Sequence, residues 1–509
     1  MANTMESPVS VIRDNDHSTL SPPRIGEWEP HLSASVVIPA HGSQDKLDLV
    51  LAALSVQSYP ASLTEVLVVD DGSSPPLRLP EIRPEHCRVL TVGDGAWGSA
   101  AGTNAGAAAA DGDVIVRLDA DMLAWREHLE SQMRWHHLAD YLVVLGHKRF
   151  VDYRPDLLTT EGVRDTVAAG KAETLFDAAE SKPQWIEKVI DATDGLAAAP
   201  WRSVANVFVG ASASVHRNLF DRAGGFDQTM PLGSDTDFGH RLAQRGAAFV
   251  PDTGSSSWHL GLPQIKTRAT DGNRYRRAFF LQRLPAHRSR RQSPLAHFEV
   301  PYVDIAVDVD RIDLDHIDSR IRPLLDGART DIRITLVAPW PEPDLQRAVV
   351  ADTELEGKIV QDYYAGEPRI RFAATAPTPH PSTPYRLELP LDYPATADTV
   401  SRLLKAADQN NAGMVELPAP GATARLVRIA AAARADHLGV PADQVAATVR
   451  LEPEDPAGPR PRRHPGEVAR LATAHKERGR QSKRAASLAR HARFSPTWLL
   501  HRLKRMIRR

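Results

Sequence analysis

The 509-residue chain has one cysteine, Cys87, and no apolar run long enough to cross a membrane. One cysteine excludes an internal disulfide and a zinc site built on several cysteines. A transmembrane helix needs about 20 predominantly apolar residues, so none is expected. Residues 1–32 are polar, lack the basic start and apolar stretch of a secretory signal, and are predicted to be a disordered lead-in. These absences favour a cytoplasmic globular protein.

The formal net charge of −2 conceals a strongly basic end. Residues 460–509 contain sixteen Lys and Arg against two Glu, a balance of +14, which leaves −16 for the rest. In SPTWLLHRLKRMIRR, helical spacing places Leu499, Leu503 and Met506 on one face and the basic residues on the other. This pattern is typical of a helix lying on an anionic membrane surface. A solvated charge run would fit too, whereas the lack of interleaved aromatic residues argues against nucleic acid.

Strand-like and helix-like stretches alternate from residue 33 to about residue 261. Strands are predicted at 33–40, 64–74, 88–94 and 113–122, and helices at 45–58 and 98–112. The alternation predicts an α/β domain whose parallel sheet is covered on both faces. Ligands of such sheets bind beyond the carboxyl ends of the strands.

The fourth predicted strand ends in two acidic residues, Asp119 and Asp121. Residues two apart on a strand point the same way, so both carboxylates can face one pocket. A divalent cation bound between them and a phosphate would relieve their repulsion. An isolated pair of this kind is more often a solvated turn. Further acidic motifs, VVDDGS at 68–73 and GSDTD at 233–237, favour the functional interpretation.

The motif at 233–237 opens a predicted helix that ends at Gly246. An aspartate at such a position is commonly only a helix cap. The alternative is a carboxylate held at the mouth of a pocket, where it can act as a general base. The motif alone leaves both interpretations of Asp235 and Asp237 open.

Several motifs then occur in a characteristic order. VVIPA and VVDDGS close the first two strands, GTNAG precedes DGDVIVRLDADM, and GGFDQTM precedes SDTDFGHRLAQRG. With this order and spacing, residues 35–261 resemble a family 2 glycosyltransferase with a GT-A fold. The resemblance covers a little under half of the chain.

The resemblance implies a nucleotide-sugar donor, a UDP-sugar above all. Asp71, with Asp70 beside it, would hydrogen-bond the base, and Asp119 would contact the ribose. The other implied donor contacts are Pro39, Ala40 and Asn104.

The resemblance also implies a divalent metal ion, Mn²⁺ or Mg²⁺. Asp121 would coordinate the ion that bridges the diphosphate, and His259 would be a further ligand, although a packed histidine would fit the sequence equally well. Asp235 matches the family's catalytic base. It would deprotonate the acceptor hydroxyl for in-line attack that inverts the anomeric configuration.

A second alternating region repeats the strand–helix–strand pattern of the first. Thirty residues separate Val36 from Val66, and twenty-nine separate Ile305 from Ile334. This similarity predicts a degenerate GT-A-like repeat, although an unrelated α/β domain would show the same common spacing.

In the second region the acidic motifs have no counterparts. Ala338–Pro339 replaces Asp70–Asp71, and Asp392–Tyr393–Pro394 replaces the D-A-D sequence. We therefore expect a non-catalytic domain that has a structural, acceptor-binding or assembly role.

The sequence thus predicts an α/β protein of four segments: a lead-in at 1–32, a GT-A catalytic domain at 33–285, a second α/β domain at 286–455 and a basic linker with an amphipathic helix at 456–509. The predicted function is the metal-dependent, inverting transfer of a sugar to a cell-envelope glycan or a lipid-linked acceptor. The protein is expected to work at the inner face of the membrane. No nucleic-acid partner is expected, and homo-oligomerisation is left open. A nucleotidyltransferase would usually bring a Gly-rich phosphate loop, which is not evident here. A nucleotide-sugar-binding scaffold without turnover would not need Asp235.

Overall fold

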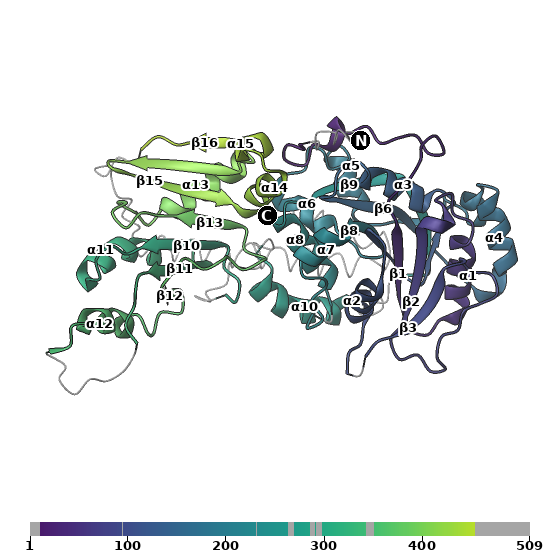
Figure 1. Ribbon diagram of the computed structural model, residues 1–509, viewed down its shortest axis with the longest axis horizontal. Coiled ribbons are helices and arrows are strands. Elements are labelled where there is room, and N and C mark those ends of the chain that lie inside the picture. The colour runs from purple at the N-terminus through teal and green to yellow at the C-terminus, as the bar shows by residue number, and fades with distance from the viewer. Residues whose placement is uncertain are drawn as a thin grey trace, which may run out of the picture. The chain divides into compact units, whose positions relative to one another are not determined.

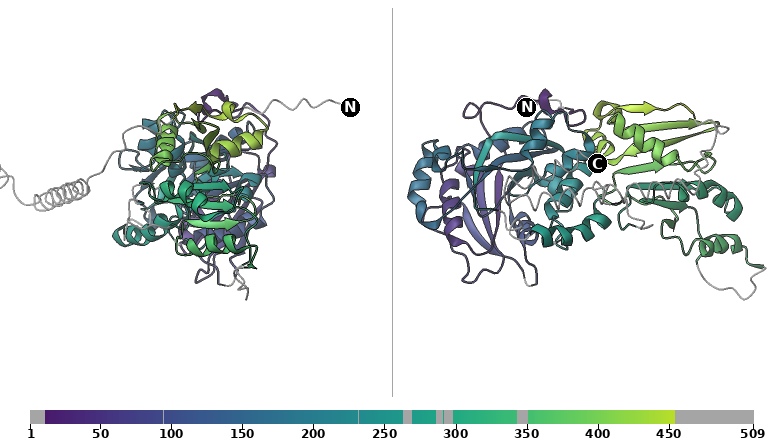
Figure 2. Two further views of the ribbon diagram at one scale, coloured as in Figure 1. Left: turned by 90° about the vertical axis from the view of Figure 1, so that its left-hand side faces the viewer. Right: turned by 180° about the vertical axis from the view of Figure 1, so that it is seen from behind.

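The computed structural model describes residues 11–93, 95–230, 232–262, 269–285, 291, 298–342 and 351–453. Residues 1–454 form one compact unit, in which two sheets follow one another along the chain (Figures 1 and 2). The predicted basic tail lies outside the described residues. Among the described helices, none is long and apolar enough to cross a membrane.

The first sheet has a parallel half and a mixed half. Its strands are β1 (Ala34–Ala40), β2 (Thr64–Asp70), β3 (Cys87–Thr91), β4 (Val114–Leu118), β5 (Met122–Ala124), β6 (Leu142–Val151), β7 (Lys182–Pro183), β8 (Ser212–His216) and β9 (Ala248–Leu260). The order is β3-β2-β1-β4-β8-β6-β9-β5, with β7 paired to β6. The first four strands are parallel, and β8 runs antiparallel to both β4 and β6. The carboxyl ends of the parallel strands β3, β2, β1 and β4 therefore meet at one edge of the sheet, and Asp70, Asp71, Asp119 and Asp121 lie at or just beyond these ends.

Helices cover both faces of this sheet (Figure 1). They are α1 (Gln44–Leu54), α2 (Ser99–Ala109), α3 (His128–His136), α4 (Thr160–Ala168), α5 (Glu187–Ala192), α6 (Trp201–Val204), α7 (Arg217–Arg222), α8 (Ser234–Gln244) and α10 (Ala269–Arg283). Apolar side chains of α1 and α3 pack in one core layer, and those of α7 and α8 pack in another. Because both faces are covered, the central strands are continuous apolar runs rather than alternating ones.

The small residues of α2 allow it to lie very close to β1. A Cβ atom on Gly106 would come within 2.4 Å of Val37 Cγ1, and one on Gly102 within 3.0 Å of Pro39 Cβ. The glycines of the GTNAG motif therefore serve helix–sheet packing. This close approach fixes α2 against the strand ends that form the site.

The second sheet follows after residue 300. Its strands are β10 (Val303–Asp308), β11 (Ile332–Val337), β12 (Ile370–Ala373), β13 (Tyr385–Glu388), β14 (Met414–Ala419), β15 (Ala422–Arg428) and β16 (Thr448–Arg450). Its helices are α11 (Leu314–Leu325), α12 (Leu355–Tyr363), α13 (Thr399–Gln409), α14 (Ile429–Leu438) and α15 (Ala442–Val445). The core of this domain is a separate apolar cluster.

The second sheet has the same topology as the main part of the first. Its order is β12-β11-β10-β13-β15-β14-β16, which matches β3-β2-β1-β4-β8-β6-β9 strand for strand. The directions match as well, since β15 is antiparallel to both neighbours and β14 is parallel to β16. Val36 pairs with Val66, and Ile305 pairs with Ile334. The spacing noted in the sequence therefore corresponds to equivalent registers in the two sheets.

The prediction of a disordered lead-in is wrong for residues 11–32. Ile12 is fully buried, and the Asn15 side chain donates to the carbonyl oxygens of Leu196 and Phe249. The segment is polar, yet its hydrogen-bonding groups find partners far along the chain, such as the Tyr141 hydroxyl and the Glu130 carboxylate, which the sequence alone does not reveal.

Candidate active site

The ends of β1 and β2 are tied together by hydrogen bonds. The Asp71 amide donates to the Ala40 carbonyl oxygen over 2.9 Å, and His41 Nδ1 lies 2.8 Å from the Asp71 carbonyl oxygen. The Gly42 amide donates to Ser73 Oγ over 2.8 Å. The two loops thus form one rigid wall beyond the sheet.

The neighbouring carboxylates of Asp70 and Asp71 have different surroundings. Asp70 is 4% exposed and accepts hydrogen bonds from the Ser73 and Leu77 amides. Burial alone would raise its pKa, but these hydrogen bonds outweigh burial and hold the pKa below the ordinary value. Asp71 is partly exposed, and its Oδ2 accepts from the Gly98 amide at the start of α2. Asp70 therefore shapes the loop, and Asp71 is the more accessible of the two carboxylates for binding the nucleotide base of a donor.

Two other predicted donor contacts have packing roles in the structure. Pro39 is buried against α2. The amide of Asn104 is engaged at both ends, because it donates to the Phe226 carbonyl oxygen and accepts from the Phe226 amide. Contact of either residue with a donor stays a prediction.

Asp119, Asp121 and His259 come together at the carboxyl edge of the first sheet. One ligand atom from each lies within 4.8 Å of the others, the one such group of three among the described residues. Asp119 and Asp121 follow β4, while β9 brings His259 opposite Met122 of β5. Burial raises the pKa of the Asp121 carboxyl, against the opposing influence of His259.

This group suits a divalent cation. Two carboxylate oxygens and an imidazole nitrogen are ligands that Mn²⁺ accepts, and Mg²⁺ prefers oxygen alone. His259 is 6% exposed and its ring packs on Phe150, with the ring centres 4.7 Å apart. His259 Nε2 lies 3.6 Å from Asp121 Oδ1, and Lys46 Nζ lies 3.7 Å from Asp121 Oδ2. The packing holds the imidazole toward the carboxylates.

A buried arginine lies between the acidic cluster and α8. Arg117 Nη1 lies 2.9 Å from Asp119 Oδ1, and its Nε donates to Thr103 Oγ1. Gly210 lies directly over this guanidinium, since a Cβ there would be 2.7 Å from Nη1. The Gly210 amide in turn donates to Asp235 Oδ2 over 3.2 Å. The acidic cluster and Asp235 thus share one scaffold, although 114 positions separate Asp121 from Asp235 in the sequence.

The two acids at the start of α8 are clearly distinguished. Asp237 is 4% exposed and pairs with Arg241, whose Nε and Nη2 lie 2.8 and 2.7 Å from Asp237 Oδ2. Asp235 is partly exposed, and among the described residues its carboxylate accepts a hydrogen bond only from the Gly210 amide. Of the two, Asp235 is therefore available as a base, and Asp237 serves the helix.

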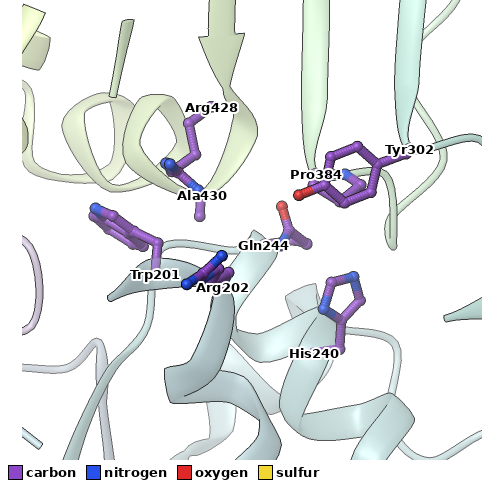
Figure 3. Close-up of a pocket in the computed structure, with 8 residues that line it drawn as sticks. All are labelled: Trp201, Arg202, His240, Gln244, Tyr302, Pro384, Arg428 and Ala430. Atoms are coloured by element: carbon purple, nitrogen blue, oxygen red, sulfur yellow. The ribbon is translucent and has the colours of Figure 1, made fainter. Parts of the chain in front are cut away.

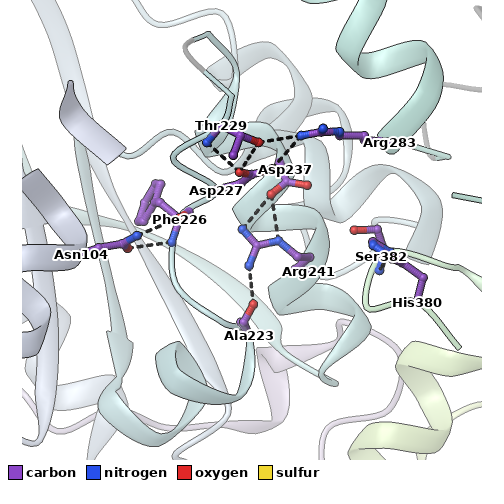
Figure 4. Close-up of polar contacts among 10 residues, drawn as sticks. All are labelled: Asn104, Ala223, Phe226, Asp227, Thr229, Asp237, Arg241, Arg283, His380 and Ser382. Carbon is purple, nitrogen blue, oxygen red and sulfur yellow. Dashed lines mark hydrogen bonds and ion pairs between the residues drawn. The ribbon is translucent and has the colours of Figure 1, made fainter. Parts of the chain in front are cut away.

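The GGFDQTM sequence forms the loop that fixes the start of α8 (Figure 4). Asn104 of α2 holds Phe226, and Arg241 of α8 donates to the Ala223 carbonyl oxygen. Arg283 of α10 donates to Thr229 Oγ1 and lies 3.3 Å from Asp227 Oδ2. Contacts from α2, α8 and α10 thus hold this loop in place before α8.

A small enclosed cavity of about 20 Å³ lies elsewhere, between α8 and the second domain (Figure 3). Residues of the first and the second α/β domain line this cavity: Trp201, Arg202, His240, Gln244, Tyr302, Pro384, Arg428 and Ala430. This volume suits about one water molecule, so the cavity is too small for a sugar nucleotide.

The sequence interpretation missed three cations of the site: Lys46, Arg117 and Lys148. Arg117 and Lys148 are buried on strands, at 6% and 1% exposure. Their signal was a basic residue interrupting an apolar strand, as in VIVRL and YLVVLGHKRFV. A buried charge is costly and calls for a partner.

Fold and site define a class of protein. An α/β sheet with a parallel half and a mixed half, covered by helices, agrees with the predicted GT-A fold, and the acidic cluster lies at its carboxyl edge. The Glycosyl transferase family 2 model matches residues 35–163. The chain therefore carries a family 2 glycosyltransferase domain, and the predicted fold class and enzyme class are confirmed.

Curated relatives extend this similarity. The chain is 24% identical over 363 residues to chondroitin synthase of Escherichia coli, covering 66% of this chain and 49% of the relative. It is 28% identical over 232 residues to the pre-mycofactocin glycosyltransferase of Mycobacterium tuberculosis, covering 45% and 43%. Hyaluronan synthase of Pasteurella multocida is 25% identical over 258 residues, covering 47% and 26%. The chain thus spans about half the length of the first relatives, or less.

Among solved structures, the mannosyltransferase PcManGT from Pyrobaculum calidifontis, in complex with GDP-Man and Mn²⁺, matches with a TM-score of 0.30 and 19% identity. That match covers 52% of this chain and 63% of the other. S. aureus TarS 1–349 matches with a TM-score of 0.32 and 16% identity, covering 49% and 66%.

Proposed function

We propose that the protein transfers a sugar from a nucleotide-diphosphate donor to a hydroxyl of a glycan acceptor, with metal dependence and inversion at the anomeric carbon. The observation that carries the proposal is the Asp119–Asp121–His259 cluster held on one scaffold with the partly exposed Asp235. The names chondroitin synthase and hyaluronan synthase support a glycan product. A UDP-sugar and a cell-envelope or lipid-linked acceptor complete the proposal.

In this proposal each side chain has a separate task. Asp121 and His259 hold Mn²⁺ or Mg²⁺, and Asp119, which the resemblance placed at the ribose, is added as a third ligand because it lies in the same cluster. When bound, the ion neutralises charge on the departing diphosphate. Asp71 binds the base beside the wall formed by Ala40. Asp235 accepts the proton of the acceptor hydroxyl as that oxygen attacks the anomeric carbon.

We also propose that the second domain is a degenerate GT-A-like repeat without catalytic activity. Its identical strand order supports this origin, and Ala338, Pro339 and Pro394 stand where the first domain has acids. Its helix α14 packs against α8. The role that these contacts favour is support of the catalytic helix.

Residues 456–509 lie outside the described residues. From their positive charge we propose that they bind an anionic membrane surface. We expect the full chain to sediment with anionic vesicles and a chain truncated after Pro459 to remain in the supernatant. Full-length protein mixed with neutral vesicles is the control. Equal sedimentation of the two chains with anionic vesicles would discard a membrane role for the tail.

A thermal-shift panel of UDP, GDP and their sugars, each with and without Mn²⁺, tests the donor and the metal together. We expect at least one nucleotide to raise the Tm, and Mn²⁺ to increase that rise, because a ligand that binds only the folded state stabilises it. Asp121→Ala is expected to abolish the Mn²⁺ increment, since it removes a ligand from the cluster. If no nucleotide raises the Tm of the wild type in either condition, the proposed function is wrong.

A further inference from the structure

Lys148, on β6, is a lysine whose side chain is buried inside the first domain. Its side chain is among the largest fully buried ones, with 1% exposure. The Lys148 ammonium makes no hydrogen bond or ion pair with another described residue. An unpaired ammonium group inside a protein is costly, so a structural role in the domain alone would be unfavourable.

The charges facing Lys148 come from three elements of the site. The carboxylates of Glu187 on α5, Asp119 after β4 and Asp235 on α8 attract it, and Arg117 on β4 repels it. Burial lowers the pKa of Lys148 to about 8, and the three carboxylates oppose that shift by favouring the ammonium form. The ammonium therefore feels the charges of both the acidic cluster and the candidate base.

The strand register places Lys148 on the same side of the sheet as His259. β6 pairs with β9 through an irregularity at Gly146/His147, after which Lys148 lies opposite Ser257 and Phe150 opposite His259. Residues two apart on a strand point to the same face. Because the Phe150 ring contacts the His259 ring, the Lys148 side chain also extends on the side of the cluster.

We propose that the Lys148 ammonium binds the β-phosphate of the donor and stabilises the departing diphosphate alongside the metal. This inference rests on the proposed function. Of the three carboxylates that attract the ammonium, a bound divalent cation would neutralise that of Asp119, and the ammonium, which has no hydrogen-bond partner, can then donate to an anion. The donor phosphate is the anion that a metal at the acidic cluster would bring to the side of the sheet on which Lys148 extends.

Lys148 takes no part in the proton transfer of the reaction. The bond from the acceptor oxygen to the anomeric carbon forms as the bond to the β-phosphate oxygen breaks, and its electron pair stays on the phosphate. The hydroxyl proton passes to Asp235. Lys148 remains protonated and donates a hydrogen bond to the phosphate oxygen, where negative charge develops.

The test compares UDP with UMP, which lacks the β-phosphate, by isothermal calorimetry in the presence of Mn²⁺, with GDP and GMP in parallel. Lys148→Met is expected to weaken nucleoside diphosphate binding about 10- to 100-fold, the size of a charge-assisted hydrogen bond. Monophosphate binding is expected to change by less than about twofold. Lys188→Met, which removes an exposed lysine on α5, is the matched control and should alter neither affinity.

A second variant, Lys148→Gln, keeps a donor of similar length without the charge and should give an intermediate loss. Equal losses for the diphosphate and the monophosphate, or no loss for the diphosphate, would overturn the assignment of Lys148 while the proposed function stands. If the wild type binds neither UDP nor GDP, both proposals are wrong.

Discussion

Asp235→Asn is expected to lower kcat by about 10²- to 10⁴-fold, the usual contribution of a general base. Nucleotide affinity should stay within about twofold of wild type. Asparagine has nearly the same shape and can still accept the Gly210 hydrogen bond through its amide oxygen, so the start of α8 should be unchanged. Single-turnover transfer and nucleotide titration measure the two effects separately.

Asp237→Asn is the matched control on the same helix. It weakens the buried pair with Arg241, so its main expected effect is a lower free energy of unfolding. The folded fraction should retain far more transfer activity than Asp235→Asn. If Asp235→Asn transfers sugar at the wild-type rate, the base is another group. If neither the wild type nor the variant transfers sugar while both bind nucleotide, a scaffold without turnover is favoured.

Arg434→Met is expected to lower the free energy of unfolding by about 3–5 kcal/mol. Arg434 is 1% exposed and donates to backbone carbonyl oxygens of Gly246, Ala247, Ile12 and Asp14. All are neutral acceptors, and burial lowers the pKa of Arg434 to about 10. Methionine fills much of the volume but leaves these oxygens without their donor. Urea unfolding curves measure the loss.

The same guanidinium joins the N-terminal segment, the end of α8 and α14. It also lies over the ring of Trp201, 4.7 Å from its centre. Arg450→Met, at a side chain 70% exposed on β16, is the control and should change the free energy of unfolding by less than about 0.5 kcal/mol. A loss below about 1 kcal/mol for Arg434→Met would mean that water replaces the guanidinium and that this connection is weak.

The strand–helix alternation and the carboxyl-edge position of Asp119, Asp121 and Asp71 could be predicted from the sequence, because both depend on local periodicity and on a general property of parallel sheets. The similarity of the second sheet to the first could be predicted from the sequence for the same reason. The strand spacing of thirty and twenty-nine residues corresponds to paired registers in both sheets. The prediction of a disordered lead-in failed because its order depends on contacts with residues far along the chain.

Sequence alone determined which acids are present and which strands carry them, since backbone periodicity sets which side chains share an edge. Only the tertiary structure distinguished Asp235 from Asp237, because the distinction depends on Arg241 occupying one carboxylate and the Gly210 amide contacting the other. It also brought His259 Nε2 within 3.6 Å of Asp121 Oδ1, 138 positions away, and buried Lys148 where the charge of Asp235, 87 positions away, attracts it. Charge pairing over such separations is decided by how strands and helices pack, a property that no local pattern encodes.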